Sequence, residues 1–330
     1  MLNLFRKNMA VQVLLIVVAW VVLWLQPLIT PPPMTADANT DGVLYSLLVN
    51  WLSGVPRLAV IIAMILVLAE GMLLNILLSD IGLVPQTTLL PTLLYIILMS
   101  APATTLTPMV PVSALLIGCT YLLMLRGTLL TIPTSRICSA TALIGLCSLF
   151  YLPALAIFVS YLFVAISFRL YNWRDIVALL LGLLAPYVLL VIILFMTDGL
   201  AEWWSATAAS LGGFAFHFRP TGTLSMIANI VLALVGLASV IMLWSKLGEH
   251  PVLWQKNAST VMLLTVGGII MLFYSSLMPI AHSFFAIPFA LCGTHMILPK
   301  RNVGIIGRRK QRLWVYDVIF ILTFVAALVC

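Results

Sequence analysis

The chain has 330 residues, of which 63% are hydrophobic and 8% are charged, and its mean hydropathy is +1.21. A soluble domain carries about 25% charged residues, so this composition excludes a soluble globular protein and predicts an integral membrane protein in contact with membrane lipids. We attribute the net charge of +7 to membrane topology, because basic residues gather on the cytoplasmic side of such proteins. No nucleic-acid partner is expected.

Apolar runs that fit membrane-spanning helices recur along the whole chain. A helix needs about 20 apolar residues to cross a bilayer, and about 17 suffice for a short one. The predicted fold is therefore all-α and polytopic, a single integral membrane domain over residues 1–330 with about eleven spans. The predicted spans are 9–26, 57–78, 88–101, 108–126, 137–151, 153–168, 176–196, 223–245, 258–274, 281–299 and 313–330.

Three of these runs, 88–101, 137–151 and 153–168, are short and lie beside prolines. They predict either separate short helices or longer helices kinked at the prolines. The basic residues favour separate helices, because merging the last two runs would place Arg136 and Arg169 on opposite sides of the membrane. We therefore expect several short, proline-broken helices.

The positive-inside rule also orients the chain. With about eleven spans and a cytoplasmic N-terminus, 14 of the 16 Lys and Arg residues lie at the inner face, and only Arg57 and Arg219 lie outside. The C-terminus is then predicted to be periplasmic. A basic cluster at residues 300–312 belongs to the inner face and is suited to anionic lipid head groups.

Two substantial loops are predicted on the outer face. The first covers residues 27–56 and contains VLYSLLVNWLS at 43–53, too short to cross the membrane but with apolar residues at helical spacing. This piece predicts a helix lying on the membrane surface. The second outer loop covers residues 197–222, with acidic residues at its start, paired tryptophans and a glycine pair.

The first outer loop contains a partial calcium-binding pattern, DANTDG, which supplies Asp37, Asn39 and Asp41. An EF-hand requires a glutamate at the twelfth position of its loop, and that position is Leu48 here. An EF-hand is thus excluded, and two interpretations stay open. The segment is either a turn in which Asp41 caps the following helix, or a looser site for a divalent cation.

The two outer arginines, Arg57 and Arg219, also allow two interpretations. Single arginines at a membrane interface commonly extend toward phospholipid head groups. The alternative is that both bind the phosphate of a lipid-linked substrate, because the planar guanidinium matches phosphate geometry.

One acidic residue, Glu70, falls inside a predicted span, about 4 Å from its midpoint at about 1.5 Å per residue. A carboxylate at that depth costs about 3 kcal/mol, so we expect it to face a partner or a cavity. His295 lies at a similar predicted depth and is the candidate partner. The pair is either a proton or substrate site, or Glu70 is a protonated side chain that is hydrogen-bonded within the bundle.

The region from Glu70 to Met196 contains the pieces LAEGMLLNILLSDIGL, GLCSLFYLPAL and NWRD. Together with the basic N-terminus, the apolar first span and Asn75, they resemble a multi-pass inner-membrane family of Bacteroidota that is sometimes mislabelled as a beta-carotene monooxygenase. The resemblance implies a bacterial inner membrane but brings no established activity. The oxygenase label has no support here, since the chain has only 4 histidines and no plausible iron-binding set.

The chain is also similar in architecture to GT-C glycosyltransferases. Those enzymes place an acidic outer loop and a surface helix after the first span, with a later helical outer loop, and use a polyprenyl-phosphate sugar donor. Here Asp37 and Asp41, residues 43–53 and residues 197–222 follow that order. The likeness implies that Asp37 or Asp41 acts as general base or metal ligand. The chain departs from the family in lacking an Asp-Glu pair in the first loop.

The sequence therefore leaves three alternative functions open. The first is a GT-C-like glycosyltransferase acting at the periplasmic face on a polyprenyl-phosphate-linked sugar, with a divalent cation as the cofactor if there is one. The second is a non-catalytic membrane subunit of a cell-envelope assembly for secretion, motility or polymer export, with membrane proteins as partners. The third is a transporter with Glu70 and His295 lining its path.

Overall fold

The computed structural model describes most of the chain up to residue 271. The described residues are 9–35, 41–84, 88–100, 105–125, 132–167, 172–212 and 247–271, with parts of 230–245 and of 284–294. Within them, all the regular elements are helices, which confirms the predicted all-α class.

Three helices are long and apolar enough to cross a membrane: α1 (Met9–Ile29), α3 (Pro56–Asp80) and α8 (Trp173–Met196). Shorter helices connect and surround them. They are α2 (Val43–Leu52), α4 (Leu90–Ser100), α5 (Met109–Leu123), α6 (Thr134–Phe150), η2 (Leu152–Ala154), α7 (Leu155–Ser167), α9 (Leu200–Gly212), η3 (Leu247–Glu249) and α11 (Val252–Met271).

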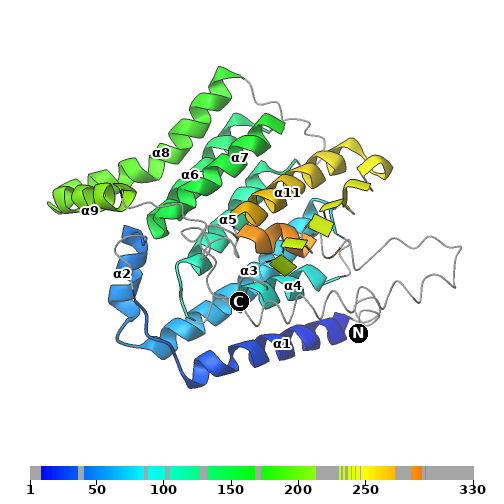
Figure 1. Cartoon of the computed structure of the whole chain (residues 1–330), viewed down its shortest axis with the longest axis horizontal. Coiled ribbons are helices and arrows are strands. Elements are labelled where there is room, and N and C mark those ends of the chain that lie inside the picture. Colours follow the sequence, from blue (N-terminus) through cyan, green and yellow to red (C-terminus); the bar gives the residue numbers. More distant parts are fainter. Residues whose placement is uncertain are drawn as a thin grey trace, which may run out of the picture.

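The helices pack in a continuous series across the molecule (Figure 1). Helix α8 packs on α6, α6 on α5, α5 on α3, α3 on α4, and α4 on α1, while α7 packs on α11. Helix α2 contacts both α6 and α3, and α9 follows directly after α8. The two segments predicted as outer loops therefore both adjoin the α6–α8 pair.

The short apolar runs form separate helices, as the distribution of basic residues predicts. Helix α6 ends at Phe150, Tyr151 has extended backbone angles, and a 3₁₀ turn containing Pro153 leads into α7. Helix α4 likewise ends at Ser100, well before α5 begins. Proline lacks the amide hydrogen that a helix interior needs, which fits the position of Pro153 at the break between α6 and α7.

Close packing of α6 on α8 depends on two glycines. A Cβ atom added at Gly182 of α8 would lie 2.0 Å from Thr141 Oγ1 and 2.3 Å from the Cys138 carbonyl oxygen. A Cβ atom added at Gly145 of α6 would lie 2.6 Å from the Leu183 carbonyl oxygen. Small residues allow helix backbones to approach closely where no hydrophobic effect drives helix association.

Polar side chains attach α1 to the rest of the bundle. The indole Nε1 of Trp20 donates a 2.9 Å hydrogen bond to the Met64 carbonyl oxygen in α3. The indole Nε1 of the fully buried Trp24 donates a 2.9 Å hydrogen bond to Ser100 Oγ at the end of α4. These two bonds join the first candidate span to the second and to its neighbouring short helix.

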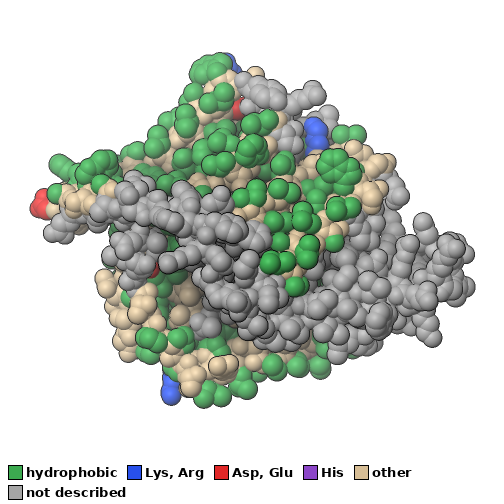
Figure 2. Space-filling model, viewed as in Figure 1, with side chains coloured by type: hydrophobic (Ala, Val, Ile, Leu, Met, Phe, Trp, Pro, Cys, Tyr) green, Lys and Arg blue, Asp and Glu red, His purple; other side chains and the backbone are tan. Residues whose placement is uncertain are grey.

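The described surface is strongly apolar. Figure 2 shows hydrophobic side chains over the visible parts of α6, α7, α8 and α11, with few charged side chains among the coloured atoms. On α8 alone, exposed positions include Leu181, Leu189 and Ile193. Such a surface is unfavourable in water and fits the lipid contact that the composition predicts.

Candidate functional site

The start of α2 is anchored to the end of α6 by main-chain contacts. The Gly42 amide donates a 2.9 Å hydrogen bond to the Phe150 carbonyl oxygen, and Asp41 forms an isolated antiparallel bridge with Tyr151. A Cβ atom added at Gly42 would lie only 1.9 Å from the Leu149 carbonyl oxygen. The approach of the two backbones therefore requires glycine at this position.

Asp41 does not cap α2, contrary to the turn interpretation of the sequence. The N-cap residue is Gly42, one position later, and no side chain makes a capping hydrogen bond. The Asp41 carboxylate instead influences Tyr45, which is buried one turn into α2. Burial, and then the charge of Asp41, raise the pKa of the Tyr45 phenol from 10.0 to about 12.

A groove of about 990 Å³ lies beside this junction, between η2, the start of α7, the second half of α8 and α9. Leu152 lines the groove and directly follows Tyr151, the residue that pairs with Asp41. Most of the wall is apolar. The apolar lining side chains are Leu152, Leu155, Leu183, Leu184, Val191, Phe195, Leu200 and Ala201.

Polar and aromatic groups concentrate at the α8–α9 side of the groove. Asp198 lies in the turn between the two helices and has a φ of 55°, a left-handed conformation that few non-glycine residues adopt. Trp203 and Trp204 line the same side, with ring centroids 6.3 Å apart. A carboxylate beside two aromatic rings suits a ligand with hydroxyl groups and a hydrophobic face.

Tyr187 brings a further hydroxyl to the groove wall. Its phenol oxygen lies 2.6 Å from Ser148 Oγ, so the two hydroxyls share a hydrogen bond between α8 and α6. Tyr187 was not among the site residues predicted from the sequence. Its signal was weak, since a tyrosine after Pro186 in a long apolar run resembles many residues of a membrane helix.

Glu70 is buried in α3, with 2% of its surface exposed. Its Oε2 atom lies 2.7 Å from the Tyr95 hydroxyl of α4 and 2.7 Å from Ser113 Oγ of α5. This arrangement matches the interpretation of Glu70 as a side chain hydrogen-bonded within the bundle. The sequence did not identify Tyr95 or Ser113, because nothing in their spacing relates them to Glu70.

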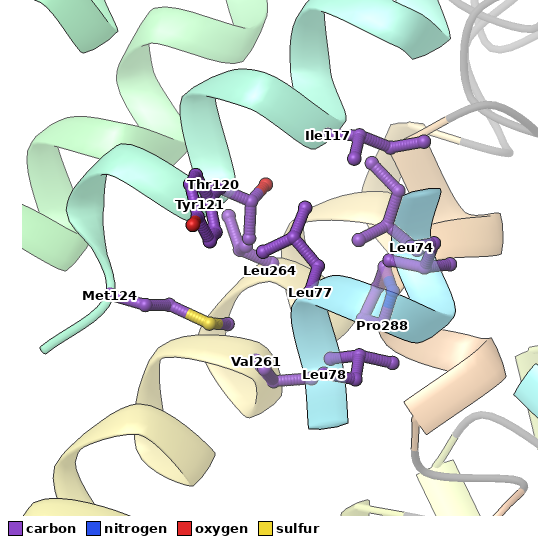
Figure 3. A pocket seen from close by; sticks show the side chains of 11 residues that line it. Leu74, Leu77, Leu78, Ile117, Thr120, Tyr121, Met124, Val261, Leu264 and Pro288 are labelled. Atoms are coloured by element: carbon purple, nitrogen blue, oxygen red, sulfur yellow. The ribbon is translucent and has the colours of Figure 1, made fainter. Parts of the chain in front are cut away.

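A second, much smaller cavity lies between α3, α5, α11 and the helical residues 284–291 (Figure 3). Its volume is about 10 Å³, about the minimum that one water molecule occupies. Among the described residues of its wall, the hydroxyls are those of Thr120 and Tyr121, and Thr120 Oγ1 is already hydrogen-bonded to Leu116 and Tyr161. This cavity is a gap in the packing rather than a substrate site.

The structure describes three of the predicted site residues, Asp41, Arg57 and Glu70. Asp41 lies at the α2–α6 junction and Arg57 is exposed at the start of α3, and neither of these two residues lines the groove. The predictions for Asp37, Asn39, Arg219 and His295 lie outside the described residues, as do the basic cluster and the last span. Among the described residues, no group of three His, Cys, Asp or Glu side chains could hold a metal ion.

Comparison with protein-family models, with curated proteins and with solved structures found no match. The groove, the Asp41 junction and the Glu70 cluster are the features of the molecule that bear on its function.

Proposed function

We propose that the protein is a GT-C-like glycosyltransferase that takes a sugar from a polyprenyl-phosphate carrier at the periplasmic face of a bacterial inner membrane. In this proposal the chain crosses the membrane about eleven times, with a cytoplasmic N-terminus and a periplasmic C-terminus. The observation that carries the proposal is the groove, which combines a long apolar wall with a carboxylate and two tryptophans, and whose lining residue Leu152 follows the backbone partner of Asp41.

The apolar wall suits the carrier chain. Leu184 and Val191 line the groove from α8, and the same helix exposes Leu181 and Leu189 to its surroundings. Because α8 is long and apolar enough to span the membrane, a lipid chain can pass from the bilayer along its side into the groove. At the α9 side of the groove, the two tryptophans then contact the sugar, since rings of Trp pack against apolar sugar faces.

The carboxylates supply the chemistry of sugar transfer. One of Asp41 and Asp198 accepts the proton of an acceptor hydroxyl as that oxygen attacks the anomeric carbon. The bond between the anomeric carbon and the phosphate oxygen breaks, and polyprenyl phosphate leaves. Arg219 and Arg57, the latter outside the groove wall, are the candidate ligands for the phosphate, because the guanidinium matches phosphate geometry. A divalent cation held by Asp41 with Asp37 and Asn39 would stabilise the charge on the departing phosphate.

The proposal is tested by the glycans of living cells. We would delete the gene and restore it as wild type, Asp41→Asn, Asp198→Asn or Asp80→Asn. Asp80→Asn is the matched control, since Asp80 is an exposed carboxylate at the C-terminal end of α3. We expect the deletion to lose a surface glycan, the wild type and Asp80→Asn to restore it, and at least one of the other two variants to fail.

Unchanged glycans in the deletion strain would overturn the enzyme proposal. Gentle purification followed by mass spectrometry of the intact complex would then test the function as a subunit of an envelope assembly. A stoichiometric membrane-protein partner is the result expected for such a subunit, and an isolated monomer would contradict it.

A further inference from the structure

The surroundings of Glu70 form a second chemical environment, away from the groove. Glu70 is the fifteenth residue of α3, about 21 Å along the helix at about 1.5 Å per residue, in a candidate membrane span of 25 residues. Its side chain faces α4 and α5, and its buried Oε1 atom has no hydrogen-bond partner within the part of the chain that the structure describes. Any charge here would sit in the interior of the bundle at membrane depth.

The hydrogen atoms of this cluster can be counted. Three short contacts must be satisfied: Tyr95 hydroxyl to Glu70 Oε2, Ser113 Oγ to Glu70 Oε2, and Ser113 Oγ to the Val110 carbonyl oxygen, each at 2.7 Å. The two hydroxyls together carry two hydrogens. An ionised Glu70 therefore leaves one contact without a hydrogen, whereas a protonated Glu70 supplies the third.

The protonated arrangement satisfies every contact. The Tyr95 hydroxyl donates to Glu70, the Glu70 carboxyl donates to Ser113 Oγ, and Ser113 donates to the Val110 carbonyl oxygen. Glu70 Oε1 is then the carbonyl oxygen of a neutral acid, for which a missing donor costs far less than it does for a carboxylate.

Among the residues that the structure describes, the hydrogen-bond partners of Glu70 carry no compensating charge. They are the neutral hydroxyls of Tyr95 in α4 and Ser113 in α5, of which Tyr95 is the titratable one. Helices α3 and α4 are closely packed next to the cluster, where Thr92 Oγ1 donates a 3.0 Å hydrogen bond to the Gly71 carbonyl oxygen. A Cβ atom at Gly71 would lie 3.3 to 3.4 Å from Thr92 and Tyr95, so this side of the cluster is tightly sealed.

We propose that Glu70, Tyr95 and Ser113 form a proton-binding site in the membrane interior, in which one proton is held on Glu70 between α3, α4 and α5. The ligand of this site is a proton rather than a metal ion or an organic substrate. The site is independent of sugar transfer in the groove, because none of its three residues lines the groove.

Infrared spectroscopy of the purified full chain in lipid at pH 7 tests this proposal. An exposed glutamate is ionised at this pH, so a protonated carboxyl gives a carbonyl band well separated from the carboxylate bands. We expect wild-type protein labelled with ¹³C-glutamate to show one protonated-carboxyl band and Glu70→Gln to lose it. Glu202 and Glu249 are the other glutamates of the chain, and Glu249→Gln serves as the control that keeps the band.

Two further variants keep the test decisive if Glu70→Gln does not fold. Tyr95→Phe and Ser113→Ala each remove a hydrogen-bond partner of Glu70, so each should shift the band to higher frequency in otherwise folded protein. A wild-type spectrum without a protonated-carboxyl band would overturn the proposal. So would a band that survives Glu70→Gln, or one that neither Tyr95→Phe nor Ser113→Ala shifts.

Discussion

The groove and the Glu70 cluster both depend on carboxyl groups, yet their surroundings are opposite. Glu70 is enclosed by hydroxyls from two neighbouring helices and sits in the middle of a regular helix. Asp41 and Asp198 lie between helices, one in a backbone bridge and the other in a left-handed turn at an open groove. In a chain with few charges, the neighbours of a carboxyl decide whether it holds a proton or faces a ligand.

The backbone explains why the two regions differ. A residue inside a helix has its main-chain groups paired within that helix, so Glu70 can be surrounded by packed side chains. Between helices the main chain needs other partners, and here the Gly42 amide finds the Phe150 carbonyl oxygen. The backbone between helices is therefore held by contacts with a neighbouring helix rather than by its own helix.

The largest effect is expected from Gly182→Leu, which would separate the wall of the groove from the rest of the bundle. Even a single added carbon at this position would lie 2.0 Å from Thr141 Oγ1 and 2.3 Å from the Cys138 carbonyl oxygen. Overpacking typically costs about 1 to 3 kcal/mol, and contact with backbone places this variant at or above about 3 kcal/mol. Thermal unfolding in detergent measures the loss.

The matched control for this variant is Gly54→Leu, because nothing lies within 4 Å of a Cβ atom added there. We expect its melting temperature to stay close to that of the wild type. Equal stability of the two variants would show that α6 and α8 do not pack as closely as the structure indicates.

A smaller loss is expected from Gly42→Ala, which tests the anchor of α2. The added methyl group would lie 1.9 Å from the Leu149 carbonyl oxygen, so α2 must move away from α6, at a cost of about 1 to 3 kcal/mol. Protease cleavage between α1 and α2 should become faster than in the wild type and in Gly54→Ala. Unchanged cleavage would contradict the anchor, and the Glu70 infrared band should be unaffected in either variant.

The helical elements of the described chain could largely be predicted from the sequence. Apolar runs bounded by proline gave α1, α3, α4, α5, α6, α7 and α8 within a few residues, and apolar spacing gave the surface helix α2. The number of spans and the orientation of the termini stay predictions. Local patterns sufficed for the helices because membrane helices satisfy their main-chain hydrogen bonds within themselves.

The site could be predicted only in part. Asp41 and Glu70 were identifiable because acidic residues are rare in so apolar a chain. Tyr95, Ser113 and Tyr187 were not, because an uncharged hydroxyl in a membrane helix becomes informative only when the packing reveals its partner. One of the two interpretations of Asp41, as the cap of α2, was wrong, since the close approach of α2 to α6 selects glycine as the N-cap residue.

A modest effect is expected from breaking the hydroxyl pair in the groove wall. Tyr187 and Ser148 join α8 to α6 with oxygen atoms 2.6 Å apart, and one such bond contributes about 1 kcal/mol. Tyr187→Phe and Ser148→Ala should each lower the free energy of unfolding by about that amount. The double variant should lose less than the sum of the two, which a double-mutant cycle measures. Strict additivity would contradict a direct bond.

The smallest effect concerns Asp41 and Tyr45, and it appears only at high pH. Because the pKa of Tyr45 is raised from 10.0 to about 12 in the folded protein, the unfolded chain loses the phenol proton first as the pH rises. The contribution of Tyr45 to the free energy of unfolding is therefore fully present below pH 10 and is lost between pH 10 and about 12.

Tyr45→Phe should lack this contribution, so the free energy of unfolding of the variant should decline less steeply than that of the wild type between pH 10 and about 12. In Asp41→Asn, the decline in the free energy of unfolding should be complete at a lower pH, because the charge of Asp41 adds to the effect of burial on the pKa of Tyr45. Chemical unfolding at a series of pH values measures both effects. If Asp41→Asn leaves the wild-type profile unchanged while Tyr45→Phe flattens it, burial alone controls Tyr45, and the Asp41 carboxylate points away from α2.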